Sequence, residues 1–577
     1  MKAQIDFPQE DGTRLALSFF RPVAVLVAHR PDEVVVVIAA AEAHARAGRW
    51  VVGFVAYEAA PAFDPAFRVL PPLDFLPLAA FSVYDRPGSD EGPAGEFSCG
   101  PWRLTTPQAR IAANMDVIHR GIAGGDYYQV NLTTRLGADF TGAGAALFVA
   151  LRAAQPDAYC AHLAGDGWQL LSVSPELFFD WQPDGTLTTR PMKGTAPRHA
   201  AATADAAAAE QLRASAKERA ENLMIVDLLR NDLARVAATG SVRVPRLFDI
   251  EALPSAWQMT STVQATTRPE VGLADVFGAL FPCGSVTGAP KVAAMAAIAA
   301  LEDAPRGAYC GAIGVIRPGG HASFSVGIRS VVVDERRGRA ECGIGSGIVF
   351  DSTAEQEYAE WLVKRRFLLR ATADFQLIET LRLEDGVYWL RNHHLERLCA
   401  SAGHFGFACV PAQVESALDA LAARLPTAAW RVRLLLDRHG AVATESYALK
   451  AVPGPLRFVI AAAPVDSSDE FLRHKTTQRA VYQAHVPPAG CFDTLLWNER
   501  GELTEFTRGN LVVEIAGRRV TPPVACGLLA GVLRAELLAR GEIHEQVVRR
   551  DELAQATGIW FINGVRGMLR VEAAAKP

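Results

Sequence analysis

The sequence lacks the patterns that mark several common classes of protein. It has no basic run or basic-aromatic stripe, and its formal net charge is −5, so nothing indicates a nucleic-acid partner. No apolar run reaches membrane-spanning length, since the longest candidate, Val34 to Ala41, ends at Glu42. The amino terminus reaches an acid at Asp6 and has no basic-then-apolar order, so we expect neither a signal peptide nor a membrane partner.

Cysteine is scarce as well. Nine cysteines, an odd number, are scattered from Cys99 to Cys526 without a CxxC pair. This distribution predicts reduced core residues in a cytoplasmic protein rather than a disulfide framework. The chain has 577 residues, half of them hydrophobic, which is too long for one core and predicts two or more domains.

The stretch RPMKGTAPR holds Lys193 between two prolines and beside a glycine. The preceding run LFFDWQPDGTLTT predicts a hairpin that turns at Asp184-Gly185 and holds Lys193 on a rigid loop. Burial or a cationic neighbour such as Arg190 or Arg198 would depress the pKa of this lysine and make it a nucleophile. A lysine in a turn, taken alone, is more often an ordinary surface residue.

Two polar features precede this lysine. Glu176 follows the strand-like run WQLLSVSP, close enough in sequence for a hairpin to bring an acid beside the nucleophile. After GGDYY, an alternating run places Gln129 and Asn131 on one face of a strand, where a merely polar face is the plainer interpretation.

Two acidic pairs occur on predicted helices. Glu218 and Glu221 are three residues apart, as are Glu357 and Glu360, so each pair faces one way. An isolated pair of this kind is usually a solvated face. Two facing pairs would form a cage of carboxylates suited to Mg²⁺.

Between these pairs lies FPCGSVTGAPKVAAMAAI, where Gly284 and Gly288 allow a tight turn and Pro290 suits the start of a helix. Such a start presents free N–H groups to an anion, although the spacing is not that of a nucleotide-binding loop. Arg329 then lies in a strand, and a glycine-rich run follows it. Arginine with glycine-exposed amides suits carboxylate binding.

The motifs SPELFF, PMKGTAPR, AENLMIVDLLRNDLARV, GSVTGAPK, YCGAIG, SVGIRS and GIGSGIVFDS, in this order, closely resemble the chorismate-utilising enzymes over roughly residues 110 to 370. That family includes anthranilate synthase, isochorismate synthase and aminodeoxychorismate synthase component I. Lys193 favours the last of these, because the other two usually carry alanine there. The isochorismate enzymes also have a lysine where this chain has Gln129. Gln258 departs from the histidine that precedes MTSTV in anthranilate synthases.

The resemblance implies that Glu221 and Glu360 bind Mg²⁺ directly, with Glu218 and Glu357 acting through water. The metal and the GSVTGAPK loop would hold the ring carboxylate of chorismate, and other residues would grip its enolpyruvyl side. The implied substrate-binding residues are Gly284, Ser285, Thr287, Gly288, Tyr309, Arg329, Gly343, Gly345 and Lys364.

The same resemblance gives the catalytic roles in the first half of the chain. Glu176 would protonate the departing 4-hydroxyl group while Lys193 adds at C2, and ammonia would then enter at C4 and expel the lysine. No GxCxGxQ-like cysteine elbow occurs in the sequence. A separate glutamine amidotransferase subunit is therefore the expected source of ammonia.

A second pattern begins after residue 374, with strands turning at Asp385-Gly386 and later the segments FLRHKTTQ, TEFTRGNL, GLLAGVLR and FINGVRG. Gly527 and Gly531 ahead of a helix would suit a phosphate. Lys475 suits a Schiff base, and a glutamate on a strand suits a protonated ring nitrogen. Each of these residues alone is more often a surface residue.

Together these segments resemble the pyridoxal-phosphate enzymes of the branched-chain aminotransferase and aminodeoxychorismate lyase fold, over about residues 375 to 577. FINGVRG departs from the usual NSxxG form. The resemblance makes Lys475 both catalytic and cofactor-binding, and Glu505 the partner of the pyridine nitrogen. The other implied cofactor-binding residues are Arg397, Asn510, Leu529, Ala530, Gly531 and Val532.

We therefore expect an α+β chain with two domains. Residues 1–372 would form a layered β-sheet domain with outer helices, and residues 375–577 a two-subdomain α/β pyridoxal-phosphate domain. The expected function is a fused, cytoplasmic aminodeoxychorismate synthase and lyase that takes chorismate to 4-aminobenzoate, with a homodimer through the second domain left open. The alternatives are an anthranilate synthase fused to an aminotransferase, or a synthase whose second domain is silent.

Overall fold

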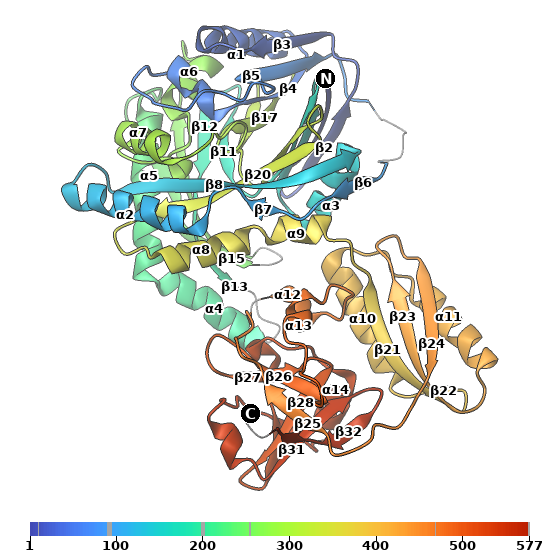
Figure 1. The fold of residues 1–577 in the computed structure, drawn as a ribbon. Helices are drawn as coiled ribbons and strands as arrows, with labels where there is room; N and C mark the ends of the chain where they lie inside the picture. The colour runs from blue at the N-terminus through green and yellow to red at the C-terminus, as the bar shows by residue number, and fades with distance from the viewer. Residues whose placement is uncertain (10, 89–94, 198–201, 253–255, 468, 575–577) are drawn as a thin grey trace. The chain divides into compact units, whose positions relative to one another are not determined.

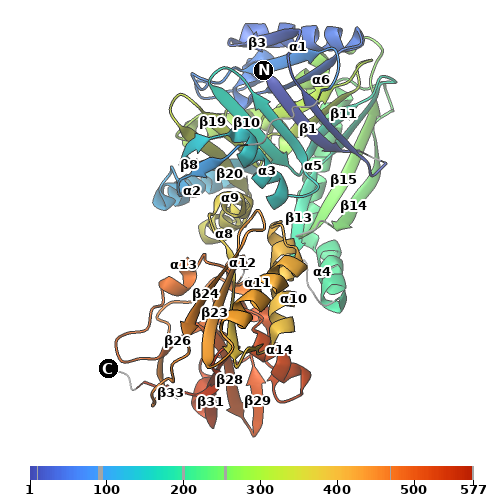
Figure 2. The same cartoon turned by 90° about the vertical axis from the view of Figure 1, so that its right-hand side faces the viewer.

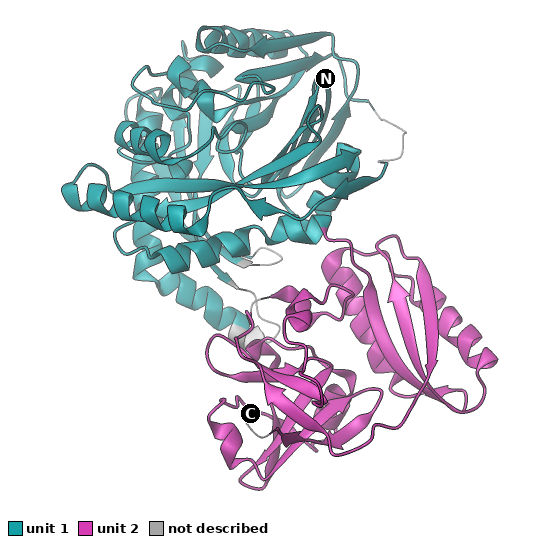
Figure 3. Ribbon diagram, viewed as in Figure 1, with its two compact units in different colours: residues 1–372 teal, residues 373–577 magenta. Residues whose placement is uncertain are grey.

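The computed structural model describes the whole chain except residues 10, 89–94, 198–201, 253–255, 468 and 575–577. The chain divides into two compact units, Met1–Thr372 and Ala373–Pro577 (Figure 3). No helix in the described ranges combines the length and the apolar character needed to cross a membrane. Both units combine helices with sheets built largely from antiparallel strands, which confirms the predicted α+β fold class (Figure 1).

The first unit contains two antiparallel sheets. The first sheet has the order β16 (Gly288–Ala289), β8 (Gln129–Gly142), β20 (Arg339–Ile348), β19 (Ser330–Asp334), β10 (Trp168–Ser174), β9 (Tyr159–Ala164), β1 (Lys2–Pro8) and β2 (Arg14–Phe19), with β6 (Phe97–Cys99) and β7 (Arg103–Leu104) also on β8. The second has the order β13 (Met192–Pro197), β15 (Ala256–Thr266), β12 (Thr186–Arg190), β11 (Leu177–Trp181), β18 (Ala322–Val326), β17 (Ala312–Ile316), β4 (Trp50–Val55), β5 (Ala79–Tyr84) and β3 (Ala24–Ala28), with β14 (Arg243–Ala252) on β15.

Helices cover the outer faces of both sheets (Figure 2). Those packed on the second sheet are α1 (Pro31–Arg46), α5 (Ala216–Ala234) and α6 (Leu273–Leu280). Those packed on the first sheet are α2 (Gln108–Gly124), α3 (Gly144–Ala154), α8 (Ala354–Lys364) and α9 (Arg366–Thr372). The remaining helical segments are η1 (Tyr57–Ala62), α4 (Ala202–Ala214), η2 (Gly284–Val286) and α7 (Lys291–Leu301).

Strand β4 shows why the layers form. Successive side chains on a strand point to opposite faces. Val51 and Val55 accordingly pack toward the helices, whereas Val52 and Phe54 pack between the two sheets. Because both faces are buried, the strand is apolar throughout rather than alternating.

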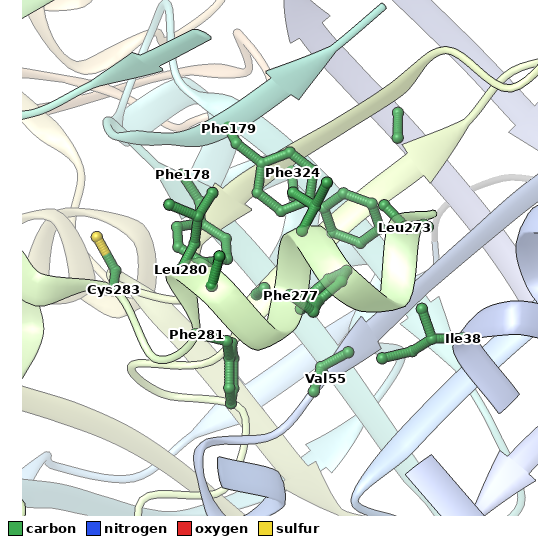
Figure 4. Close-up of a cluster of buried hydrophobic side chains, with 14 of the residues drawn as sticks. Ile38, Val55, Phe178, Phe179, Leu273, Phe277, Leu280, Phe281, Cys283 and Phe324 are labelled. Carbon is green, nitrogen blue, oxygen red and sulfur yellow. The ribbon is translucent and has the colours of Figure 1, made fainter. Parts of the chain in front are cut away.

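The helix-side core centres on an aromatic cluster (Figure 4). Phe277 on α6 lies edge-on to Phe179 at 5.4 Å between ring centroids and to Phe324 at 5.2 Å. Such edge-to-face pairs add to the free energy gained by burying the rings. They fix α6 against β11 and β18, so the segment after α6 leaves the core at a defined point toward η2.

The second unit contains two sheets. The smaller has the order β22 (Val387–Tyr388), β21 (Leu377–Glu384), β23 (Ala429–Leu436) and β24 (Val442–Ala448). The larger has the order β30 (His544–Glu545), β29 (Arg518–Thr521), β28 (Gly509–Ile515), β27 (Leu503–Phe506), β26 (Asp493–Trp497), β25 (Arg457–Ile460) and β33 (Glu572–Ala573), with β31 (Gly558–Asn563) on β28 and β32 (Gly567–Arg570) on β31.

Two helices cover the smaller sheet of this unit, α10 (Arg391–Phe405) and α11 (Pro411–Arg424). The other helical segments are α12 (Glu470–Arg473), α13 (Ala480–Gln483), η3 (Val524–Cys526), α14 (Val532–Ala539) and η4 (Glu552–Gln555). Strand β26 pairs in parallel with β25 and antiparallel with β27, so the larger sheet is mixed.

Candidate active sites

A cavity of about 470 Å³ opens in the first unit, between the start of β11, strands β13 and β20, and helices α5 and α8. Both Glu176 and Lys193 line it. Glu176 is 5% exposed, and its Oε1 has no hydrogen-bond partner among the described residues. Burial raises the pKa of Glu176 to about 7, although Ser285 and the charge of Lys193 oppose the shift. Near neutral pH a large share of this carboxyl group is therefore protonated, and it can donate that proton.

Lys193 lies on a bulged strand rather than on the expected loop. The pairing of β13 with β15 shifts register between Met192 and Thr195, so Lys193 and Gly194 form the irregular step. Gly194 has φ 88°, a conformation that favours glycine. Gln258 braces the bulge, because its Nε2 donates to the Gly194 carbonyl oxygen at 2.7 Å.

The charged neighbours expected for Lys193 are placed differently. Arg190 forms an ion pair with Glu251, so its positive charge is compensated by that carboxylate. Arg198 lies outside the described residues. The hairpin prediction is confirmed, since β11 and β12 pair antiparallel across a turn in which Gly185 has φ 86°.

The opposite wall of the cavity suits an anion. Arg329 lines it, and no ion pair among the described residues joins it to a carboxylate. Desolvation lowers the pKa of Arg329 to about 10, which leaves it charged and ready for a carboxylate. Its guanidinium group donates to Gln155. Gln155 could not be predicted from the sequence, because its contact with Arg329 joins segments far apart in the chain.

The glycine-rich strand β20 lets side chains approach closely. A Cβ atom on Gly343 would lie 2.2 Å from the ring of Tyr309, and one on Gly345 would lie 2.4 Å from the Leu132 carbonyl oxygen. Lys364 donates from Nζ to the Gly345 carbonyl oxygen at 2.9 Å. The predicted residues Tyr309, Gly343, Gly345 and Lys364 all line the cavity.

The GSVTGAPK segment contributes only part of its predicted set. Ser285 lines the cavity, whereas Gly284, Thr287 and Gly288 do not. Thr287 instead donates from Oγ1 to the Cys283 carbonyl oxygen at 3.1 Å, inside the loop. Gly288 has φ 140°, and a Cβ atom there would lie 2.1 Å from the Gln129 carbonyl oxygen. These three residues therefore shape the loop rather than face the ligand space.

Four carboxylates from α5 and α8 line the same cavity, namely Glu218, Glu221, Glu357 and Glu360. Burial raises the pKa of Glu221, and the charges of Glu218 and Glu360 add to the shift against the opposing charge of Lys193. A cation would relieve this repulsion, and oxygen ligands suit Mg²⁺.

These carboxylates do not form a coordination cluster as they are arranged. Lys364 holds Glu360 at 2.6 Å, and Ser352 donates to Glu357 at 2.7 Å. Within the described ranges, no group of three or more acidic, His or Cys side chains is gathered closely enough to hold a metal ion. The donor set thus fits Mg²⁺ in chemistry and location, and Glu360 would have to exchange Lys364 for the ion.

A second cavity, of about 580 Å³, lies within the second unit. It brings together Lys475, which precedes a short bridge to β21, and Glu505 on β27. Desolvation, and after it the charge of Arg397, lower the pKa of Lys475 to about 8. Burial raises the pKa of Glu505 to about 8, against the hydrogen bonds from Tyr482 and the Leu529 N–H and the charges of Lys475 and Arg479.

These groups fit pyridoxal phosphate. A lysine with a lowered pKa is a competent nucleophile toward an aldehyde. A buried carboxyl group would form an ion pair with the protonated ring nitrogen of the cofactor. Asn510 donates to Glu505 at 3.1 Å and to the Leu529 carbonyl oxygen at 2.8 Å. Gly531 caps α14, where a Cβ atom would lie 1.9 Å from Asn510 Oδ1. Val532 follows it at the cavity wall, so the helix start faces the space where a phosphate would bind.

Two predicted phosphate contacts are partly engaged elsewhere. Arg397 lines the cavity but forms a double ion pair with the buried carboxylate of Glu379, through contacts of 2.8 and 2.6 Å. It also donates to the Ala530 carbonyl oxygen at 3.1 Å. Ala530 itself does not line the cavity. Gly527 lies away from the cavity as well, packed against Ser467.

Sequence reasoning missed three residues here. Glu379 sits between Leu377 and Leu381 on the buried face of β21, and a lone acid on such a face was the available signal. Its Oε2 accepts from His394 at 2.6 Å. Tyr482 donates to Glu505 at 2.8 Å, a contact that no spacing rule indicates.

Each of the two units matches a known protein family. Residues 9–370 match the chorismate binding enzyme family, and residues 376–574 match amino-transferase class IV. Aminodeoxychorismate synthase component 1 of Salmonella typhimurium is 40% identical over 259 residues, which cover 45% of this chain and 56% of that protein. Its counterpart in Escherichia coli is 39% identical over 269 residues, covering 47% and 59%.

Anthranilate synthases are similar to nearly the same degree. Component 1 from Streptomyces coelicolor is 38% identical over 295 residues, covering 51% of this chain and 56% of that protein. The crystal structure of component I from Streptococcus pneumoniae superposes with a TM-score of 0.50 at 25% identity, covering 63% of this chain and 89% of that one. The chain thus spans between 56% and 59% of the length of the three sequence relatives.

Proposed function

Because this chain belongs to the chorismate binding enzyme family, we propose that its first unit aminates chorismate at C4 and that its second unit then releases pyruvate to give 4-aminobenzoate. The observation that carries the proposal is the pair Glu176 and Lys193 in one cavity, a protonated acid beside a lysine. Their joint presence supports attack by an amine with loss of a hydroxyl group. An alanine at the lysine position would leave ammonia to attack directly.

The first reaction is a double displacement. Lys193 Nζ bonds to C2 of chorismate, both conjugated ring double bonds shift by one position, and the C4–O bond breaks as Glu176 gives its proton to the hydroxyl group, which leaves as water. Ammonia then bonds to C4, both double bonds shift back, and the C2–N bond to Lys193 breaks. Arg329 would hold a carboxylate of the substrate throughout. A glutamine amidotransferase subunit is the proposed source of ammonia.

Magnesium belongs to this proposal as an ion held by Glu221 and Glu360, with Glu218 and Glu357 acting through water. Bound there, Mg²⁺ would supply positive charge for the ring carboxylate of the substrate. The second unit would hold pyridoxal phosphate through Lys475, Glu505, Asn510 and the start of α14.

In the second reaction, pyridoxal phosphate supplies a sink for the electron pair left when C4 loses its proton. Lys475 would hold the aldehyde carbon of the cofactor and, once displaced by the amine, take that proton. Glu505 would keep the ring nitrogen protonated. Loss of the proton at C4 and cleavage of the C3–O bond release pyruvate and leave an aromatic ring.

A product assay tests the proposal. Purified protein with Mg²⁺, pyridoxal phosphate, chorismate and an ammonium salt should form 4-aminobenzoate and pyruvate in equal amounts, measured by chromatography. Glutamine alone should not replace ammonium without an added glutaminase subunit. Anthranilate as the main product would instead support an anthranilate synthase fused to an aminotransferase. Accumulated aminodeoxychorismate without pyruvate would show that the second domain is silent.

The Mg²⁺ site is tested by Glu360→Gln. Removing one ligand charge should lower amination of chorismate by about 100-fold or more, because metal affinity depends on charged oxygen ligands. The absorbance of bound pyridoxal phosphate should not change. Glu355→Gln, on the same helix but away from the cavity, is the matched control. Undiminished amination by Glu360→Gln after chelation of the metal would refute the site.

A further inference from the structure

Positive side chains dominate the wall of the second cavity. Five arginines and Lys475 line it, and Glu505 is the one acid among its described lining residues. A cavity with this balance favours a ligand with more than one negative charge. The phosphate of the cofactor accounts for part of that charge, at Arg397 and the start of α14. The other arginines have no role in the reaction described above.

Three of them lie on separate elements and converge on the cavity. Arg431 is on β23, Arg508 is in the turn between β27 and β28, and Arg566 is in the turn between β31 and β32. Desolvation lowers the pKa of Arg566, and the charges of Arg431 and Arg508 lower it further. Arg566 is therefore close enough to the other two arginines for electrostatic repulsion between them. Like charges held together are costly unless negative charge offsets them, and such a cluster is typical of an anion-binding site.

Little in the described residues neutralises this cluster. Arg566 donates only to the Lys450 carbonyl oxygen, at 2.9 Å, and Arg431 stacks over Tyr447 at 4.8 Å. In the part of the chain that the structure describes, no ion pair joins either of these two arginines to a carboxylate. Arg508 differs, because its Nε pairs with the buried carboxylate of Asp493 at 3.1 Å.

The turns that carry two of the arginines are clamped together. Asn563 Oδ1 accepts from the backbone N–H of Arg566 at 2.8 Å, and its Nδ2 donates to the Arg508 carbonyl oxygen at 3.1 Å. At Gly564, a Cβ atom would lie 2.6 Å from Val532, at the start of α14. The two turns are therefore fixed to each other beside the start of α14, which places both arginines at the cavity, as preorganised binding requires.

We propose that Arg431, Arg508 and Arg566 form a carboxylate-binding site that makes the second unit select amines with two carboxylates. The inference rests on the proposed function, because aminodeoxychorismate carries one carboxylate on its ring and another on its enolpyruvyl group. An ordinary α-amino acid has a single carboxylate and would leave part of the cluster uncompensated. Arginine suits this role, since it binds carboxylates through two parallel hydrogen bonds.

The test uses full-length protein loaded with pyridoxal phosphate and supplied with aminodeoxychorismate. Arg566→Gln should raise KM by about tenfold or more while kcat changes by less than about threefold, because the arginine binds rather than reacts. Arg566→Lys should restore part of the loss. Arg570→Gln, an exposed arginine on β32 outside the cavity, should behave like the unmodified protein.

Binding is measured separately with two inert probes, 3-(carboxymethoxy)benzoate with two carboxylates and benzoate with one. The visible absorbance of the bound cofactor reports on the second unit alone. The unmodified protein should bind the dianion at least about tenfold more tightly than the monoanion, and Arg566→Gln and Arg431→Gln should each reduce that ratio.

The outcomes separate the two proposals. If the unmodified protein does not convert aminodeoxychorismate, the lyase function is wrong, yet the probe titration still decides whether the arginines bind dianions. If conversion occurs and both glutamine variants keep the KM and the preference for the dianion, the arginine site is wrong. Should Arg566→Gln fail to bind the cofactor, Arg566→Lys and Arg431→Gln carry the same comparison.

Discussion

Replacing Lys193 with alanine is expected to lower the formation of aminodeoxychorismate from chorismate and ammonia by at least about 1,000-fold. The reason is that the first displacement loses its nucleophile, and ammonia has no activated C4 to attack. Glu176 would still protonate the 4-hydroxyl group, so direct attack of ammonia at C2 becomes the open route. We therefore expect the residual product to shift toward anthranilate, which chromatography separates from 4-aminobenzoate.

The control for this variant is Lys450→Ala, an exposed lysine that does not line either cavity. It should leave amination unchanged. Lys193→Ala should also convert supplied aminodeoxychorismate at the unmodified rate, which excludes a general loss of folding. Full amination at C4 by Lys193→Ala would show that Lys193 is not the nucleophile.

Replacing Lys475 with alanine should stop the second reaction and spare the first. The variant should still consume chorismate and ammonia, but it should accumulate aminodeoxychorismate. Release of pyruvate and 4-aminobenzoate should fall by at least about 1,000-fold, because no other residue holds the cofactor covalently and takes the C4 proton. The visible absorbance due to the cofactor bound through the lysine should disappear.

An added, unrelated lyase should restore both products from the Lys475→Ala mixture, and this rescue shows that the accumulated compound is the true intermediate. Lys450→Ala again serves as the matched lysine control. If Lys475→Ala forms 4-aminobenzoate at the unmodified rate, the second unit is not the lyase. The silent-domain alternative would then apply.

The local elements of the candidate sites could be predicted from sequence. The turn at Asp184-Gly185 depends on neighbouring residues alone, and the structure has a hairpin there. The spacing of Glu218 and Glu221 needs only helical periodicity, and both lie on α5 facing one cavity. Short-range rules suffice for such features, because backbone preference and side-chain direction repeat with a fixed period.

Contacts between distant segments escaped the same rules. The bulge at Lys193 depends on the register of β13 with β15, which lie far apart in the chain. Glu379 binds Arg397 from another element of the second unit. These contacts are set by tertiary packing, which no window of neighbouring residues encodes.

The bulge in β13 is held by residues other than the proposed nucleophile, Lys193. Gly194 supplies the backbone conformation and Gln258 braces its carbonyl oxygen, so neither depends on the side chain of the lysine. Exchange of the Lys193 side chain is therefore expected to change the proposed chemistry of the first unit while the strand pairings of β13 persist. Reactivity and folding stability can then vary independently at this one position.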